Sequence, residues 1–468
     1  MRKHYHLIGI GGIGMGALAS LLLAKGHKVS GSDLKASDLT ERLKKNGVEI
    51  TIGHHAGNVR GPDFVVYSSA VPMANPERIE SVSRGIPLLR RAEVLAQLVN
   101  EQIGITVAGA HGKTTTTSMI ACLLTEAGLN PTIAVGGIIN SSGHHAHLGE
   151  GKYFVAEVDE SDGTFLYFKS HFSIITNVDF EHVDHYKDWD GILSAYAKFM
   201  QCTRPGGTVI ICGQDERLRR LAKVHALRTL VYGFDSSFDI VGADVVTDGF
   251  NSRFSCRTPQ GKLGDFELAV GGEHNVLNAL ACITVGLALN IDTAVIRRAL
   301  GTFSGVRRRF QLKGEADDIM VVDDYGHHPT EITATLKAAR LFAGRRLLTV
   351  FQPHRYSRTK FLLDEFAHSL GLTDELILTD IYAAGEKPNE GVATAQLFQR
   401  VRAVLGNRAV YVQKGSVVET LVRVARPGDL VLFLGAGDIT DLCDPFLAAL
   451  RERAFDQRVG ISHREPLG

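Results

Sequence analysis

Two glycine-rich loops limit what this chain can fold into. They read GIGGIG at residues 9–14 and GAHGKT at residues 109–114. Each follows a short apolar run and precedes a helical pattern, an arrangement in which a parallel sheet presents the N-terminus of a helix to a phosphate group. Two such units in one chain predict two α/β sections that each bind a phosphate-bearing ligand.

Alternating strand and helix patterns continue along the chain and predict an α/β fold with parallel sheets. A length of 468 residues allows two or three domains. The pattern restarts before the second glycine loop and again after the basic stretch GVRRRF at 305–310. We therefore predict three domains: a Rossmann-like N-terminal domain at 1–100, a P-loop-type central ATP-binding domain at 101–311, and a Rossmann-like C-terminal domain at 312–468.

Composition favours small-molecule partners. Basic and acidic residues balance at 51 each, so nothing marks the chain as an electrostatic binder of nucleic acid. The six cysteines form no C-x-x-C pair, which is typical of a reducing compartment. The uncharged stretch at 7–24 contains five glycines, which are unfavourable inside a membrane helix. A strand over His6–Ile10, a turn and a helix over about Met15–Lys25 explain it better, and we expect a cytoplasmic protein without membrane insertion.

The first loop satisfies the pattern G-x-G-x-x-G and is followed by Asp33 at the end of the next predicted strand. Glycines let the backbone approach a diphosphate, which the helix N-terminus stabilises. NAD fits this pattern as well as a UDP-sugar does, and a tight turn without a ligand is the alternative. The predicted diphosphate-binding residues are Gly9, Gly11, Gly12, Gly14 and Asp33.

The second loop is two residues shorter than the common form G-x-x-x-x-G-K-[ST], yet it keeps every part that ATP binding needs. Backbone N–H groups would surround the phosphates, Lys113 would reach the terminal oxygens, and the Thr114 hydroxyl would bind Mg²⁺. A chance glycine turn before a lysine is the alternative. The predicted ATP-binding residues of this loop are Gly109, Ala110, His111, Gly112, Lys113, Thr114 and Thr115.

An acidic turn follows the predicted strand YFVAE. Its four carboxylates, the first of which is Glu157, lie within six residues and repel one another unless a cation sits among them. Oxygen ligands of this kind suit Mg²⁺. We interpret the turn as a metal site, with a solvated acidic turn as the alternative.

The remaining motifs occur in one order along the chain: SGSD, AEVDESDGTFL, TNVDFEHVDHY, GEHNVLNALA, VRRRFQ, DDYGHHPTEI and QPHRYSRT. With the two loops they resemble the Mur ligase superfamily, and the resemblance extends from Gly9 to Thr359 across all three sections. It implies an ATP-dependent ligase that joins L-alanine to the lactyl carboxylate of UDP-N-acetylmuramate through an acyl phosphate, in peptidoglycan precursor synthesis. It also implies a monomer or a homodimer.

The resemblance assigns roles to individual residues. UDP would bind at the first glycine loop, and Mg²⁺ at Thr114, Glu157 and His182. Lys198, beyond this histidine, is not assigned the modification found in some relatives. The C-terminal domain would carry the amino-acid site and close over ATP. The implied catalytic residues are Lys113, His182 and Arg355; further ATP contacts are Asn275 and Asp324; and the amino-acid site comprises Tyr325, His354, Arg355 and Arg358.

Other functions stay open at this point. A related ligase that attaches a whole tripeptide to the same sugar nucleotide is the closest alternative, although its first loop lacks the form GIGGIGM. Folylpolyglutamate synthase lacks a UDP-binding section, and a nicotinamide dehydrogenase would leave the second loop without a role. A nucleotide-sensing binding protein could keep both loops without catalysing a reaction.

Overall fold

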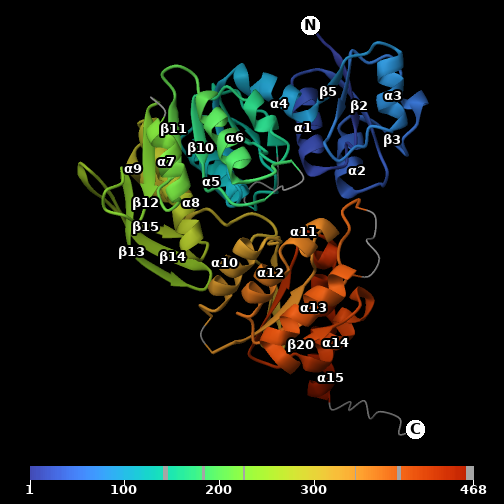
Figure 1. Cartoon of the computed structure of the whole chain (residues 1–468), viewed down its shortest axis with the longest axis vertical. Coiled ribbons are helices and arrows are strands. Elements are labelled where there is room, and N and C mark those ends of the chain that lie inside the picture. Colours follow the sequence, from blue (N-terminus) through green and yellow to red (C-terminus); the bar gives the residue numbers. More distant parts are fainter. Residues whose placement is uncertain (141–145, 182–184, 225–226, 343, 387–391, 460–468) are drawn as a thin grey trace. The chain divides into compact units, whose positions relative to one another are not determined.

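A computed structural model describes residues 1–140, 146–181, 185–224, 227–342, 344–386 and 392–459. The chain forms two compact units, of which the first holds residues 1–246 and 251–306 and the second holds residues 247–250 and those from 307 onward. The described residues form three sheets, which come one after another in the sequence and therefore run from blue to red in Figure 1. The predicted α/β class is confirmed, while the bounds of the three predicted domains stay predictions.

The first sheet is entirely parallel, in the order β3-β2-β1-β4-β5. Its strands are β1 (His4–Ile8), β2 (Lys28–Asp33), β3 (Glu49–Ile52), β4 (Phe64–Tyr67) and β5 (Leu88–Arg90). Its helices are α1 (Ile13–Ala24), α2 (Asp38–Lys45), α3 (Pro76–Ser83) and α4 (Arg91–Asn100). The first strand ends two residues earlier than predicted, because the glycine turn already begins at Gly9, whose φ is 78°.

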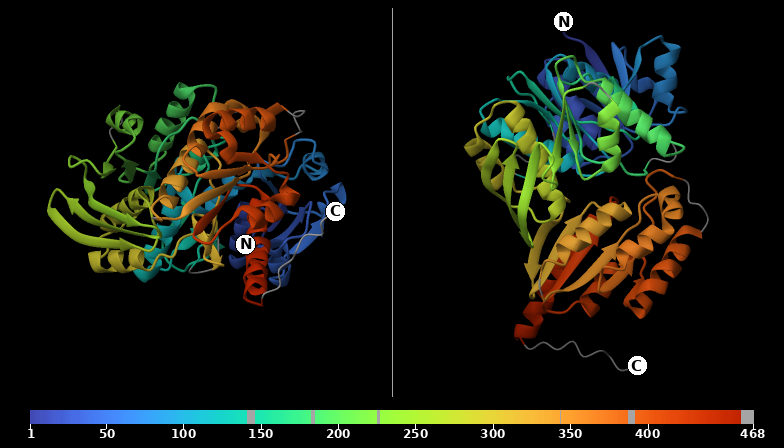
Figure 2. Two further views of the ribbon diagram at one scale, coloured as in Figure 1. Left: turned by 90° about the horizontal axis from the view of Figure 1, so that it is seen from below. Right: turned by 60° about the vertical axis from the view of Figure 1, so that its left-hand side comes forward.

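The second sheet has the order β15-β14-β13-β12-β11-β10-β6-β9-β7-β8. Its strands are β6 (Ile103–Ala108), β7 (Thr132–Ala134), β8 (Ala146–His147), β9 (Tyr153–Glu157), β10 (Phe172–Ile175), β11 (Thr208–Cys212), β12 (Thr229–Gly233), β13 (Ile240–Asp248), β14 (Asn251–Thr258) and β15 (Gly261–Leu268). Its helices are α5 (Lys113–Glu126), α6 (Trp189–Gln201), α7 (Glu216–Val224), α8 (Glu273–Ala288) and α9 (Thr293–Gly301). Figure 2 shows the yellow-green strands β13 to β15 extending from one end of this sheet.

The third sheet, in the second unit, has the order β16-β17-β21-β18-β19-β20, and only the pair β16–β17 is antiparallel. Its strands are β16 (Gln311–Ala316), β17 (Ile319–Asp324), β18 (Arg346–Phe351), β19 (Glu375–Leu378), β20 (Ala409–Tyr411) and β21 (Asp429–Leu434). Its helices are α10 (Pro329–Ala339), α11 (Tyr356–Phe361), α12 (Leu363–Leu370), α13 (Val392–Leu405), α14 (Val417–Val424) and α15 (Cys443–Val459).

Central strands are buried on both faces, as their continuous apolar sequences predict. Every residue of β11 and of β21 is buried. Helix α1 is buried along most of its length because it is apolar nearly all round, which accounts for the uncharged stretch at its position. Among the residues that the structure describes, no helix combines the length and apolar character needed to cross a bilayer.

The first two sheets pack into one unit through a shared core. Buried side chains of the first section, such as Leu18 and Val99, belong to the same cluster as Phe165 and Phe199 of the second. Polar contacts add to this packing, since Asn100 donates to the Tyr167 carbonyl at 3.1 Å and accepts from the Lys169 N–H at 2.8 Å. Both glycine loops therefore belong to one body.

Candidate active site

The loop at 109–114 connects β6 to α5, and its two glycines are sterically required. Gly109 has a φ of 130° and Gly112 a φ of 81°, which side chains of L-residues rarely adopt. A Cβ atom on Gly109 would lie 2.1 Å from the Thr176 hydroxyl, and one on Gly112 would lie 2.6 Å from the Asn278 amide oxygen. The close approach of these two polar side chains explains why the loop needs glycine at both positions.

The segment after β10 braces this loop. The Asn177 side chain accepts from the His111 N–H at 2.8 Å and donates to the His111 carbonyl at 2.9 Å. The Asn177 carbonyl accepts from the Ala110 N–H at 3.2 Å. The His111 ring contacts Asp179 at 2.9 Å. Strands β6 and β10 are neighbours, which brings the loop and this segment to one sheet edge.

Lys113 begins α5 and turns back toward its own loop. Its ammonium group donates to the Glu160 carboxylate at 2.8 Å, to the Ala110 carbonyl at 3.1 Å, and also to the Gly109 carbonyl. Burial alone would lower the pKa of Lys113, but the negative charge of Glu160, followed by that of Asp159, raises it above its ordinary value. Lys113 therefore carries its charge at neutral pH. The sequence did not predict the pairing with Glu160, which belongs to the acidic turn.

Thr114 and Glu157 meet, as the predicted metal site requires. The Thr114 hydroxyl donates to Glu157 at 3.0 Å, and the other Glu157 oxygen accepts from the Gly136 N–H at 2.8 Å. Strands β6 and β9 pair in parallel with Val107 opposite Glu157, so both residues lie at the same sheet edge. These two oxygen donors fit Mg²⁺. The third predicted ligand, His182, lies outside the described residues.

Helix α8 brings two asparagines against the first turn of α5. Asn278 accepts from the Thr116 hydroxyl at 3.0 Å and donates to Asn275 at 3.2 Å. Asn275 donates to the Gly271 carbonyl at 2.8 Å and is buried. The amide of Asn275 is thus engaged within the protein, and its predicted contact with ATP stays a prediction. Thr115 is buried in the same turn.

The first glycine loop lies between β1 and α1. Asp33, at the end of β2, accepts from the Gly11 N–H at 2.8 Å and so holds the loop from the neighbouring strand. A Cβ atom on Gly14 would lie 3.1 Å from the guanidinium of Arg91, which places this cation over the first turn of α1. The motif did not reveal Arg91, because this residue is far away in the sequence. Gly9, Gly11, Gly12, Gly14 and Asp33 stay predicted UDP ligands.

Glu77, whose carboxylate is fully buried, lies near the carboxyl end of β2 in the first sheet. It accepts from the His6 ring at 2.9 Å, from the Ser32 hydroxyl at 2.7 Å and from the Asn58 amide at 2.8 Å. Burial alone would raise the pKa of Glu77, but these three hydrogen bonds lower it to about 2. Glu77 therefore connects three separate segments around the end of β2, and no sequence motif indicated it.

In the second unit, Asp324 is buried rather than open to a ligand. Its carboxylate accepts from the N–H groups of Phe310 and Gly326, each at 2.7 Å, and from the Thr335 hydroxyl at 3.1 Å. Burial raises the pKa of Asp324 to about 6, against the opposing charge of Arg309. These bonds hold the left-handed backbone of Phe310, whose φ is 45°. The nucleotide contact of Asp324 stays a prediction.

The predicted amino-acid residues gather at the carboxyl ends of β17 and β18. The guanidinium groups of Arg308 and Arg309 lie 4.9 and 5.2 Å from the centre of the Tyr325 ring. Arg358 donates to the Nδ1 atom of His354 at 3.3 Å. Strand β21 lies between β17 and β18 and is parallel to both, so the carboxyl ends of β17 and β18 belong to one edge of the same sheet.

Two features of this edge suit the binding of a charged ligand. Arg355 is exposed and has a φ of 71°, a strained conformation of the kind found at functional sites. Burial, followed by the charges of Arg358 and Arg355, lowers the pKa of His354 to about 4, so this imidazole is neutral at pH 7. The positive charge of the edge therefore comes from arginine.

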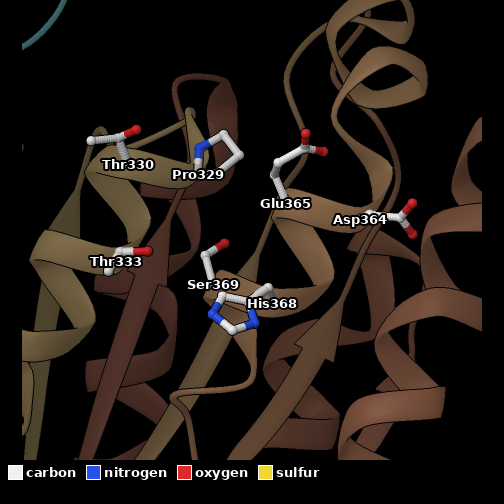
Figure 3. A pocket seen from close by; sticks show the side chains of 7 residues that line it. All are labelled: Pro329, Thr330, Thr333, Asp364, Glu365, His368 and Ser369. Carbon is white, nitrogen blue, oxygen red and sulfur yellow. The ribbon is translucent and has the colours of Figure 1, made fainter. Parts of the chain in front are cut away.

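A groove of about 540 Å³ lies elsewhere on the second unit. Figure 3 shows it between α10 and α12, lined by Pro329, Thr330, Thr333, Asp364, Glu365, His368 and Ser369. None of the predicted site residues lines it, and its two carboxylates come from the exposed first turn of α12. We assign no ligand to this groove.

Family comparisons cover most of the chain. The Mur ligase family catalytic domain matches residues 4–103, the Mur ligase middle domain matches 107–286, and the Mur ligase glutamate ligase domain matches 308–437. A UDP-N-acetylmuramate–L-alanine ligase from Geotalea uraniireducens is 46% identical over 95% of this chain and 98% of its own length. One from Solibacter usitatus is 47% identical over 96% of both chains.

Solved structures agree with these relatives. A UDP-N-acetylmuramate–alanine ligase from Thermotoga maritima matches with a TM-score of 0.82 and 30% identity, over 97% of this chain and all of the other. A murein peptide ligase from Psychrobacter arcticus matches with a TM-score of 0.71 and 27% identity, over 96% and 99% of the two chains.

Proposed function

The chain belongs to the Mur ligase family, and we propose that it joins L-alanine to the carboxylate of UDP-N-acetylmuramate with consumption of ATP. The observation that carries the proposal is the pairing of Lys113 with Glu160 and of Thr114 with Glu157 near the ends of β6 and β9. Relatives of nearly the same length, at 46 and 47% identity, bear the name of this activity.

A carboxylate anion is a poor electrophile, so we propose an acyl phosphate as intermediate. A carboxylate oxygen of the sugar nucleotide attacks the γ-phosphorus of ATP, and the bond to the bridging oxygen breaks to release ADP. The amine nitrogen of alanine then attacks the acyl carbon, phosphate leaves with the bonding electrons, and the nitrogen loses a proton. The first step brings a carboxylate against the anionic γ-phosphate, and the second releases an anionic phosphate, so the site must supply positive charge.

The chain supplies that charge at fixed positions. Lys113 is charged and faces its own loop, and the N–H groups at the start of α5 would be available to bind a phosphate. Thr114, Glu157 and His182 would hold Mg²⁺, which when bound would neutralise charge on the phosphate oxygens. The first glycine loop would bind the UDP diphosphate. Arg355 and Arg358 would bind the carboxylate of alanine through their planar, paired donors.

One assay separates this function from its alternatives. ADP and phosphate are measured with UDP-N-acetylmuramate while single amino acids and the tripeptide L-alanyl-D-glutamyl-diaminopimelate are supplied in turn. We expect product only when ATP, the sugar nucleotide and L-alanine are all present. A preference for the tripeptide would favour the related ligase, and steady ADP release with ATP alone would contradict the proposal.

A further inference from the structure

An amino acid at neutral pH is a zwitterion, so a site that selects it needs an anion as well as cations. The residues predicted from the sequence are the cations Arg355 and Arg358, the neutral His354 and the phenol of Tyr325, so they include no anion. The carboxylate that would complete such a site must reach the same sheet edge. This inference rests on the proposed function, because it concerns how the amino-acid substrate is recognised.

The segment after β19 meets that requirement. Strands β18 and β19 are parallel neighbours, so the loops after them emerge together. The Arg355 N–H donates to the Tyr382 carbonyl at 2.9 Å, and His354 and Tyr382 form an isolated parallel bridge. Their rings stack with centres 5.7 Å apart and an angle of 15° between planes. Residues 379–386 are thus fixed along the segment that carries the arginines.

Glu386 lies at the end of this segment, and its carboxylate is held in place. One oxygen accepts from the Ser357 hydroxyl at 2.5 Å and the other from the Ser357 N–H at 3.1 Å. Burial alone would raise the pKa of Glu386, but the hydrogen bonds from Ser357 and the charge of Arg355 hold it below its ordinary value. The carboxylate is therefore ionised, and an ionised carboxylate can accept further hydrogen bonds at both oxygens.

The two facing loops also share backbone strain. Arg355 has a φ of 71° and Ala384 a φ of 48°, and neither residue is glycine. Such conformations persist where the surroundings over-determine them, and they cluster at ligand-binding sites. The strain thus falls on the short stretch of each loop that sets the position of Arg355 and of Glu386.

We propose that Glu386 is a specificity-determining residue that binds the ammonium group of the amino-acid substrate, while Arg355 and Arg358 bind its carboxylate. The neighbouring histidine is neutral and does not repel the ammonium group. The bonds from Ser357 hold the Glu386 carboxylate in place, close enough to Arg355 for the charge of this arginine to act on it. An acid that lacks the amino group would keep its contact with the arginines and lose its contact with Glu386.

The alternative is that Glu386 only fixes the start of α11 through Ser357. The two explanations differ for ligands with and without an ammonium group. L-Alanine carries both charges, whereas propionate carries only the carboxylate, so the ratio of their affinities isolates the contribution of the ammonium contact. A purely structural loss would weaken both ligands alike.

The test uses the full-length enzyme and its variants Glu386→Gln and Glu386→Asp, with Glu365→Gln as the control. Glu365 is an exposed carboxylate of α12 in the same unit. The KM for L-alanine and the inhibition constant of propionate against L-alanine are measured for each. We expect Glu386→Gln to raise the alanine KM roughly ten- to a hundredfold, as for loss of a hydrogen bond between charged groups, and to leave propionate inhibition unchanged.

The Asp variant keeps the charge and should retain most of the preference for alanine over propionate, whereas Glu365→Gln should behave like the wild type. The inference is overturned if alanine and propionate weaken together in Glu386→Gln, or if the alanine KM does not change. Should the Gln variant fail to fold, a weakening of alanine and propionate by the same factor in Glu386→Asp would overturn the inference as well. A wild type that forms no product from alanine would instead contradict the proposed function.

Discussion

The loop at 109–114 in the first unit (the phosphate loop) and the sheet edge that carries Arg355 and Arg358 in the second unit (the arginine edge) differ in where their polar groups find partners. The loop at 109–114 is braced by Asn177 and Glu160, and its lysine, threonines and glycines are packed against protein. Arg355 is exposed, and its backbone is strained. The first region is organised by contacts within the protein, whereas Arg355 of the second region presents its charge to solvent.

The largest effect should come from Lys113→Ala. Losing a charge directed at the transferred phosphoryl group should slow acyl-phosphate formation about a thousandfold or more. ADP release is measured with UDP-N-acetylmuramate present, and binding of UDP to the first glycine loop should persist. The control is Lys152→Ala, an exposed lysine of the same unit. A loss of only a few-fold would mean that the loop does not serve phosphoryl transfer, and the comparison would fail.

Glu77 tests how much internal pairing contributes to stability. Its pKa is about 2 in the folded protein against an ordinary 4.5, so the unfolded chain binds more protons between these values. The ionised carboxylate should stabilise the folded state fully above pH 4.5 and lose that contribution, about 3 kcal/mol, as the pH falls toward 2.

Urea unfolding of the wild type and of Glu77→Gln across this pH range measures the contribution. The variant should be less stable at pH 7 and should lose this part of the acid dependence. Glu80→Gln on the same helix is the control, since Glu80 forms an ion pair with Arg84 near the surface. Equal acid dependence in the wild type and in Glu77→Gln would show that the buried carboxylate contributes nothing.

Arg355→Ala tests the exposed side of the comparison. Truncation should lower kcat/KM for L-alanine about a hundredfold, because a charge-assisted pair with the substrate carboxylate is lost. The KM values for ATP and UDP-N-acetylmuramate should hardly change. Arg355→Lys should recover only part of the loss, since lysine lacks the planar fork. Lys360→Ala, an exposed cation of the same helix segment, is the control, and an equal effect in both variants would contradict a specific role for Arg355.

The smallest effect should come from Thr114→Val. The substitution removes one oxygen donor of the proposed metal site, and we expect the Mg²⁺ concentration for half-maximal activity to rise about tenfold. Thr117→Val is a matched control, because the Thr117 hydroxyl donates only to the Lys113 carbonyl within the same helix. An unchanged Mg²⁺ requirement would remove Thr114 from the proposed metal ligands.

Local sequence predicted the parts of the site that depend on contiguous residues. Strand, glycine turn and helix N-terminus form one continuous stretch from Ile103 to Thr115, so local sequence alone could predict this loop. The α/β class followed from the alternation of apolar strands and helices, and family comparison supports it. The assignments to individual site residues, His182 among them, stay predictions.

The sequence by itself determined the glycine loops, the buried strands and the identity of the charged groups, because these follow from backbone sterics and from periodicity over a few residues. The tertiary structure decided which charges meet. Glu160 pairs with Lys113, Arg91 lies over Gly14, and Glu386 joins the arginine edge only because parallel neighbouring strands end at one side of a sheet. Such pairings depend on strand order, which no local pattern encodes, and burial then sets the pKa values that make Asp324 and His354 differ from their ordinary behaviour.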